Sequence, residues 1–325
     1  MNLHKDSEIY RDAIKATAQQ KNIREIYIEK DYWVTYALHA IFHSNMKDLA
    51  VFKGGTSLSK CYQAINRFSE DIDIVVFQDE GLSNSQMDKR VRRVSKILDD
   101  TILEEVEVKD ITKKRGQFRK VAYEYDKNGY RQDFGQVRDK IIVEVSRLGH
   151  FEPYEKIEVN SLINEMIEST GKDELIDKYG LQPFTLNVLR IERTFCEKIM
   201  SLVRFSYADD PYQELSMKIR HIYDLHMLLK KPKVQDFFKS NEFDKMLTKV
   251  GKDDIESYGD QYEWLYKHPV SALVFNEPQE TWNVIRTVYN STFKDLVIGD
   301  LPAEDNLISD LKSLSNRIEK ISWTL

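Results

Sequence analysis

The spacing of apolar residues predicts two helices and a short strand at the start of the chain. Residues 7–20 and 29–44 carry apolar side chains at helical spacing. Residues 49–53, LAVFK, are typical of a strand, and Gly54-Gly55 follows as a turn. Residues 56–65 then return to helical spacing. The opening of the chain is therefore expected to be helix, helix, strand, turn and helix.

Alternation of apolar and polar residues predicts three further strands. These are DIDIVVF at 71–77, VAYEYD at 121–126 and KIIVEVS at 140–146. Between the first two, residues 86–106 have the pattern of a long, charged amphipathic helix. The first half of the chain thus mixes helices with strands.

The second half is predicted to be mainly helical. All seven prolines lie at or after Pro153, which marks a change of composition there. We expect an α+β protein with a helical lead at 1–48, a core at 49–180 and a C-terminal helical domain at 181–325. The predicted C-terminal helices cover residues 187–206, 213–230, 234–249, 278–296 and 305–322.

Composition excludes several classes of protein. With 41% hydrophobic residues, the 325-residue chain can bury a core, which a disordered chain cannot. It has neither a transmembrane stretch nor the apolar start of a secretory signal, so we expect a cytoplasmic protein. Its two cysteines, Cys61 and Cys196, cannot form a disulfide framework or a cysteine-rich zinc site. The net charge of -6 argues against a non-specific nucleic-acid coat but allows a local basic patch.

The segment FKGGTSLSK, residues 52–60, has the features of a phosphate-binding turn. Gly54 and Gly55 allow a tight turn after a strand, close to a ligand. Thr56 and Ser57 then open a helix, whose free N–H groups favour a phosphate, and Lys60 lies one turn inside. The spacing is not that of a P-loop. The alternative is a plain Gly-Gly turn.

Asp71 and Asp73 form the second part of a possible catalytic site. Lying two apart on a predicted strand, they face the same side, while the intervening apolar residues face the core. Like charges so placed repel each other, and a divalent cation such as Mg²⁺ removes that cost. A phosphate-binding turn beside a metal-binding carboxylate pair is what nucleotidyl or phosphoryl transfer requires. The alternative is an edge strand with solvated aspartates.

The segments KGGTSLSK and RFSEDIDIVV together resemble the signature of the DNA polymerase β-like nucleotidyltransferase superfamily. Within it, the chain is similar to the AbiEii/AbiGii toxin family of bacterial toxin–antitoxin and phage-defence systems. Three segments carry this narrower resemblance, which spans about residues 25–230. They are IEKDYWVTYAL at 28–38, IERTFCEKIMSLV at 191–203 and KIRHIYDLHMLL at 218–229.

The resemblance implies a polymerase β-like core with a mixed sheet, and a role for individual residues. Asp71 and Asp73 would bind Mg²⁺ or Mn²⁺, with Glu144 as a third carboxylate and Glu124 as its rival. Lys198 would contact the phosphates of the NTP, and Asp224 would complete the site. The remaining nucleotide-binding residues would be Gly54, Gly55, Thr56, Ser57, Lys60 and Ser69.

Lys198 and Asp224 also have ordinary explanations. Lys198 lies beside the apolar stripe of its predicted helix, where a lysine can extend its ammonium group to solvent. Asp224 follows Arg220 by four residues, the spacing of a helical ion pair.

The run KKRGQFRK is a candidate nucleic-acid contact. Its cations bind phosphates, and Phe118 could stack on a base. The alternative is a solvated hairpin. A solvated face is likewise predicted for four cations on the helix before it, Arg90, Arg92, Arg93 and Lys96. His39 and His43 have the spacing of a metal pair but lack an acidic third ligand. The cations of the run are Lys113, Lys114, Arg115, Arg119 and Lys120.

The resemblance implies a Mg²⁺-dependent toxin that transfers a nucleotide from an NTP to an acceptor hydroxyl. The Men-type toxins, which are related, suggest the tRNA 3′ end as acceptor, a block of translation and neutralisation by a cognate antitoxin. Two alternatives stay open: a protein or small-molecule acceptor, and a non-catalytic nucleotide-binding scaffold. The oligomeric state is not predicted.

Overall fold

The computed structural model describes residues 1–79, 81–127, 138–259 and 262–325. The chain forms two compact units. The core unit contains residues 1–61 and 68–189, and the helical unit contains residues 62–67 and 190–325. This division differs from the predicted one: the helical lead belongs to the core unit, and the second unit begins at residue 190 rather than 181.

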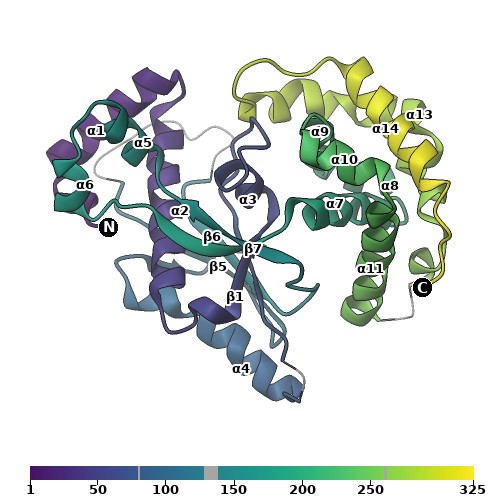
Figure 1. Cartoon of the computed structure of the whole chain (residues 1–325), viewed down its shortest axis with the longest axis horizontal. Coiled ribbons are helices and arrows are strands. Elements are labelled where there is room, and N and C mark those ends of the chain that lie inside the picture. Colours follow the sequence, from purple (N-terminus) through teal and green to yellow (C-terminus); the bar gives the residue numbers. More distant parts are fainter. Residues whose placement is uncertain (80, 128–137, 260–261) are drawn as a thin grey trace. The chain divides into compact units, whose positions relative to one another are not determined.

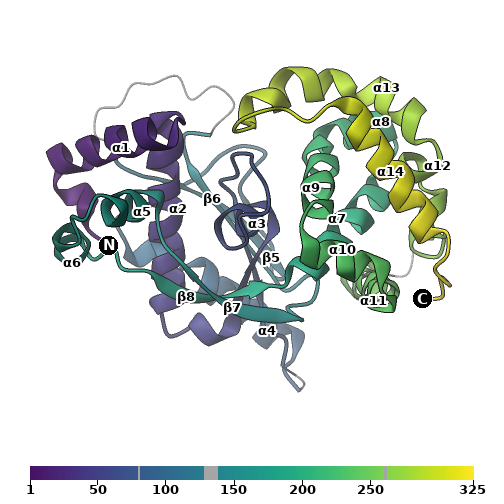
Figure 2. The same cartoon turned by 45° about the horizontal axis from the view of Figure 1, so that its top comes forward.

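A mixed sheet organises the core unit, and eight of its strands lie in the described residues. The strand order is β3-β5-β6-β2-β1-β8-β7, with β4 paired to β5. β1 is antiparallel to β2, while β2 is parallel to β6 and β1 is parallel to β8. Figure 2 shows β7 and β8 running side by side. The bounds are β1 Ala50–Lys53, β2 Ile72–Val76, β3 Glu104–Val106, β4 Lys113–Lys114, β5 Phe118–Glu124, β6 Ile141–Ser146, β7 Tyr154–Val159 and β8 Phe184–Leu189.

Helices pack around this sheet (Figure 1). The helix α2 is the most buried, with Tyr32 and Trp33 fully enclosed, and α1 and α5 pack against it. The apolar side chains of β2 are buried as its alternation predicts. The helices of this unit are α1 Ser7–Lys21, α2 Glu25–His43, α3 Gly54–Lys60, α4 Asn84–Ser95, α5 Leu162–Ser169 and α6 Glu174–Tyr179.

The helical unit takes in a segment from the first half of the chain. Residues 62–67 join it through a bridge between Arg67 and Val297 and a hydrogen bond from the amide of Ile298 to the carbonyl of Asn66, at 2.8 Å. Its main helices are α7 Ile191–Phe205, α8 Pro211–Met217, α9 Ile219–Leu229, α10 Pro232–Lys239, α11 Asn241–Tyr258, α12 Leu273–Asn276, α13 Pro278–Val288 and α14 Glu304–Ile318.

Several predicted elements need correction. The helix expected over 86–106 ends at Ser95, and residues 104–106 form the edge strand β3 because they pair with β5. The helix expected over 187–206 begins at Ile191, since the preceding residues FTLNVL form β8 beside β1. The predicted helices 213–230 and 234–249 are each divided in two, at Lys218 and at Ser240. In each case, strand pairing or a helix cap determines where the helix begins or ends.

Among the helices that the structure describes, not one combines the length and apolar character needed to cross a lipid bilayer.

Candidate active site

The glycine turn lies directly against Asp73. β1 ends at Lys53, which is the register partner of Asp73 in β2, and α3 begins at Gly54. Gly54 has a φ of +80°, a conformation that favours glycine. A Cβ atom at this position would lie only 2.0 Å from Oδ2 of Asp73. The turn and the carboxylate therefore converge, and glycine is the residue that allows it.

Asp73 lies among other carboxylates. Its register partner in β6 is Glu144, and Asp71 precedes it by two residues. Burial raises the pKa of Asp73 to about 7, and the negative charges of Glu144 and Asp71 add to the effect. Nζ of Lys120 lies 3.4 Å from Oε2 of Glu144 and offsets part of this repulsion. A bound cation would relieve the rest.

The donor set fits a hard divalent cation. Asp71, Asp73 and Glu144 offer only carboxylate oxygens, which Mg²⁺ and Mn²⁺ prefer. In the part of the chain that the structure describes, no three His, Cys, Asp or Glu side chains are arranged to hold a metal by themselves. An ion at Asp73 would therefore draw some of its ligands from elsewhere, as Mg²⁺ commonly does from substrate phosphates.

Glu144 and its predicted rival Glu124 are separated by the structure. Glu144 is beside Asp73 across the β2–β6 pairing. Glu124 lies on β5 opposite Glu104 and forms an ion pair of 3.1 Å with Lys140. This placement favours Glu144 as the third carboxylate.

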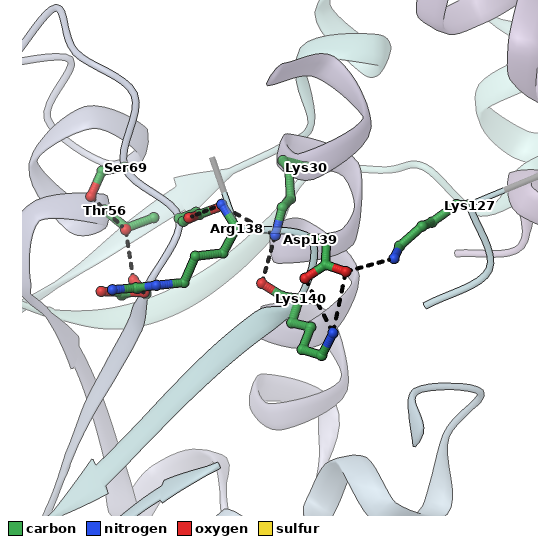
Figure 3. A network of polar contacts seen from close by, with 9 residues as sticks. Lys30, Thr56, Ser69, Lys127, Arg138, Asp139 and Lys140 are labelled. Carbon is green, nitrogen blue, oxygen red and sulfur yellow. Dashed lines mark hydrogen bonds and ion pairs between the residues drawn. The ribbon is translucent and has the colours of Figure 1, made fainter. Parts of the chain in front are cut away.

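Asp71 is anchored by residues that the sequence did not single out. Nη1 of Arg138 lies 2.9 Å from Oδ1 of Asp71, and the Arg138 amide donates to Oε1 of Glu70 at 2.9 Å. Glu70 forms a 3.1 Å ion pair with the buried Lys30, whose ammonium donates to the carbonyl of Lys140 at 2.6 Å. Figure 3 shows this network. Lys30 lies in the segment IEKDYW on which the family resemblance partly rests, whereas no sequence pattern marks Arg138.

The hydroxyl groups of the turn hold it together. Oγ1 of Thr56 donates to the carbonyl of Asp71 at 2.6 Å and lies 3.0 Å from Oγ of Ser69 (Figure 3). Oγ of Ser57 donates to the carbonyl of Gly54 at 2.8 Å. These contacts fix the start of α3 to the start of β2. A contact of the same residues with a nucleotide stays a prediction.

Lys60 and Gly55 complete the predicted nucleotide-binding set. Gly55 belongs to the first turn of α3. Nζ of Lys60 forms an ion pair of 2.6 Å with Asp31 of α2, and Asp31 also accepts from the amide of Leu162 at 2.7 Å. Lys60 is thus engaged by α2 in this structure, and its contact with phosphate stays a prediction.

Lys198 and Asp224 are brought together inside the helical unit. Nζ of Lys198 lies 2.7 Å from Oδ2 of the fully buried Asp224. Arg67 binds the same carboxylate through Nε and Nη2, each at 2.7 Å. Burial alone would raise the pKa of Asp224, but the two cations outweigh it and lower that pKa. Arg67 is 157 residues away in sequence, so helical spacing could not reveal it.

The structure also describes the surroundings of the histidine pair, the cysteines and the basic run. The rings of His39 and His43 stack at 3.8 Å, and Nδ1 of His43 lies 2.9 Å from the His39 carbonyl. The thiol of Cys196 is buried, and Cys61 is half-buried. The basic run forms the hairpin β4–β5, with Lys113 opposite Lys120 and Lys114 opposite Arg119.

The mixed sheet and the close approach of Gly54 to Asp73 agree with the predicted nucleotidyltransferase, and comparison with known proteins shows the family. The model of the nucleotidyl transferase AbiEii toxin family, from type IV toxin–antitoxin systems, matches residues 36–310. The chain belongs to this family. It is therefore a nucleotidyltransferase toxin whose family implies an antitoxin partner.

A solved structure shows the same fold. The nucleotidyltransferase toxin MenT4 of Mycobacterium tuberculosis is 17% identical, with a TM-score of 0.58, over 95% of this chain and 90% of that chain. The Helicobacter pylori protein JHP933 is also 17% identical, with a TM-score of 0.40, over 90% of this chain and 93% of that chain. No curated protein matches the sequence.

Proposed function

We propose that this toxin transfers a nucleoside monophosphate from an NTP to the 3′ end of tRNA and so blocks translation. The close approach of Gly54 to Asp73 supports the proposal, because the glycine turn lies directly against a carboxylate. The acceptor hydroxyl would attack the α-phosphate, forming a new P–O bond as the bond to pyrophosphate breaks. The hydroxyl proton would pass to a carboxylate, for which Glu144 is the candidate.

Asp71, Asp73 and Glu144 would hold Mg²⁺ or Mn²⁺ in this reaction. The ion would neutralise charge on the phosphates. Arg138 supports the arrangement by fixing one oxygen of Asp71, and Thr56 supports it by fixing the Asp71 backbone. Gly54, Gly55, Ser57, Ser69 and Lys60 complete the set of residues proposed to restrain the triphosphate.

Lys198 and Asp224 are proposed to serve the same reaction. Lys198 would contact the nucleotide phosphates, and Asp224 would orient its ammonium group, which it holds at 2.7 Å. The role in the cell would be that of a cytoplasmic toxin active in phage defence and neutralised by its antitoxin.

Incubation with each labelled NTP, Mg²⁺ and bulk tRNA or total protein tests the proposal. We expect label in tRNA, lost in Asp73→Asn and Glu144→Gln but retained in Glu124→Gln, a matched carboxylate on the neighbouring strand. Label in a protein band or a small molecule, with tRNA unlabelled, would favour the alternative acceptors. Unchanged toxicity of a folded Asp73→Asn variant would instead support a non-catalytic scaffold.

A further inference from the structure

A groove in the core unit, between α4 and the hairpin β4–β5, gathers positive charge. Its volume is about 710 Å³, and its lining includes one carboxylate, Asp88, and no apolar side chain. Six cations line it: Lys89, Arg92, Lys96, Lys114, Arg115 and Arg119. The helix and the hairpin contribute three cations each.

The cations of α4 form a row. Lys89, Arg92 and Lys96 are exposed and follow one another at spacings of three and four, so they share one face. Met87 and Val91 lie on the buried face of the same helix, which fixes the direction of the row. Neighbours in the row are about one helical turn, about 5.4 Å, apart. A row of this kind matches a chain of phosphates better than a single phosphate.

The hairpin is seated closely on α4. A Cβ atom at Gly116 would lie 2.3 Å from Oδ2 of Asp88, so the turn of the hairpin touches the helix. The other oxygen of Asp88 lies 3.0 Å from Nε of Arg147. The one carboxylate in the groove is therefore already neutralised by a cation from outside its lining.

Most of the cations are free to bind an anion. Among the described residues, four of the six form no ion pair: Lys89, Arg92, Arg115 and Arg119. Nε of Arg119 is buried and has no hydrogen-bond partner in that part of the chain. Lys96 and Lys114 each have one acidic neighbour, Asp99 and Glu105.

We propose that this groove binds the sugar-phosphate backbone of the RNA acceptor, an inference that rests on the proposed transfer to RNA. Protein interfaces have apolar centres and few lysines, whereas six of the nine residues that line this groove are cationic. Lysine and arginine side chains are what phosphate backbones require. The net charge of the whole chain is -6, so the attraction must come from a local concentration of cations such as this one.

The groove is separate from the carboxylate site. Arg119 lines the groove, while the next residue, Lys120, contacts Glu144. Successive side chains of a strand point to opposite faces of the sheet. The groove would therefore hold the body of the RNA, and only its acceptor end would reach Asp73.

Binding of bulk tRNA, without nucleotide, tests the proposal in the full-length Asp73→Asn background. The triple variant Lys89→Ala, Arg92→Ala, Lys96→Ala removes the row. The control triple variant Lys15→Ala, Arg93→Ala, Lys172→Ala removes three exposed cations elsewhere on the core unit, including the neighbour of Arg92 on α4. Circular dichroism establishes that both are folded, and fluorescence anisotropy at several salt concentrations gives Kd.

We expect the row variant to raise Kd for tRNA at least tenfold, with the control variant close to the parent. The slope of log Kd against log salt should fall by about 2 to 3, since each lost phosphate contact removes about 0.7–0.9. Equal effects of the two triple variants, or none from the row variant, would overturn the proposal. So would loss of antitoxin binding with tRNA binding intact. This experiment measures binding and not catalysis. A failure of the proposed nucleotide transfer would therefore be seen in a different assay and would not be confused with a failure of the groove to bind tRNA.

Discussion

At the scale of single residues, the candidate site depends on the absence of a side chain at Gly54. Any side chain at position 54 would collide with the carboxylate of Asp73, and the φ of +80° adds backbone strain. The sequence pattern predicted the turn beside the carboxylates but not the close approach of Gly54 to Asp73, which depends on the tertiary fold. Arg138 and Arg67 were missed for the same reason: only the tertiary fold brings them to their aspartates.

We predict that Gly54→Ala abolishes nucleotide transfer. The control is Gly171→Ala, which has a similar φ of +66° but open space around its Cβ. Both variants should lose about 1 kcal/mol or more of stability through backbone strain. Only Gly54→Ala should also displace Asp73. Urea unfolding and transfer assays on both variants check this, and equal activity of the two would contradict it.

Glu29 is predicted to make stability depend on pH. Burial raises the pKa of Glu29 to about 7, and its Oε1 atom has no hydrogen-bond partner among the described residues. Because this pKa lies above that of the unfolded chain, ionisation of Glu29 costs stability as pH rises from about 4.5 to 7. Glu29→Gln removes that cost, so the variant should exceed the wild type by about 1–3 kcal/mol at pH 8.

Urea unfolding of both proteins between pH 4.5 and 8 measures the difference. The two should be similar at pH 4.5, where Glu29 is neutral in the folded wild type and only about half ionised in the unfolded chain. A difference that does not change with pH would show that Glu29 is not the titrating group.

At the scale of elements, periodicity was most informative where an element is amphipathic and self-contained. The strands β2 and β6 and the helix α1 lie close to their predicted ranges. β3 and β8 escaped prediction because pairing with a neighbouring strand decided their conformation. The sequence thus predicted the glycine turn and the strand with the aspartates, but not the strands and ion pairs that hold them in place.

The tie between α3 and β2 depends on one hydroxyl. Thr56→Val keeps the shape of this buried side chain but removes its hydrogen bond to the carbonyl of Asp71. We expect a loss of about 1–2 kcal/mol of stability and reduced transfer activity, because the start of β2 is no longer held. Thr17→Val is the control, since Oγ1 of the equally buried Thr17 bonds only within α1, to Ala13 at 2.7 Å. Full activity of a stable Thr56→Val variant would contradict the expectation.

At the scale of the whole molecule, charged side chains gather in three distinct clusters. The core unit carries a carboxylate site and a separate cationic groove. The helical unit contains a buried cluster, in which Asp224 contacts both Lys198 and Arg67. Such a cluster is costly to form and more costly to break on one side.

Asp224→Ala should therefore lower stability by about 3–5 kcal/mol, because it leaves two buried cations without their partner. Lys198→Met should cost less, since Arg67 still binds both oxygens of Asp224. If Lys198 contacts the nucleotide, its variant should nevertheless lose transfer activity while remaining folded. Thermal unfolding together with transfer assays separates the two effects.

The excursion of residues 62–67 into the helical unit also limits how the protein can be dissected. The chain leaves the core unit after Cys61 and re-enters it at Phe68. In sequence, this excursion lies between the glycine turn and the strand that carries Asp73. A fragment ending at Leu189 would contain the buried residues Ala64 and Ile65 but lack residues 190–325, the rest of the unit to which they belong. Neither unit is one continuous stretch of polypeptide. Proteolytic or genetic separation would therefore expose apolar side chains and yield aggregation-prone fragments rather than two independently folded domains.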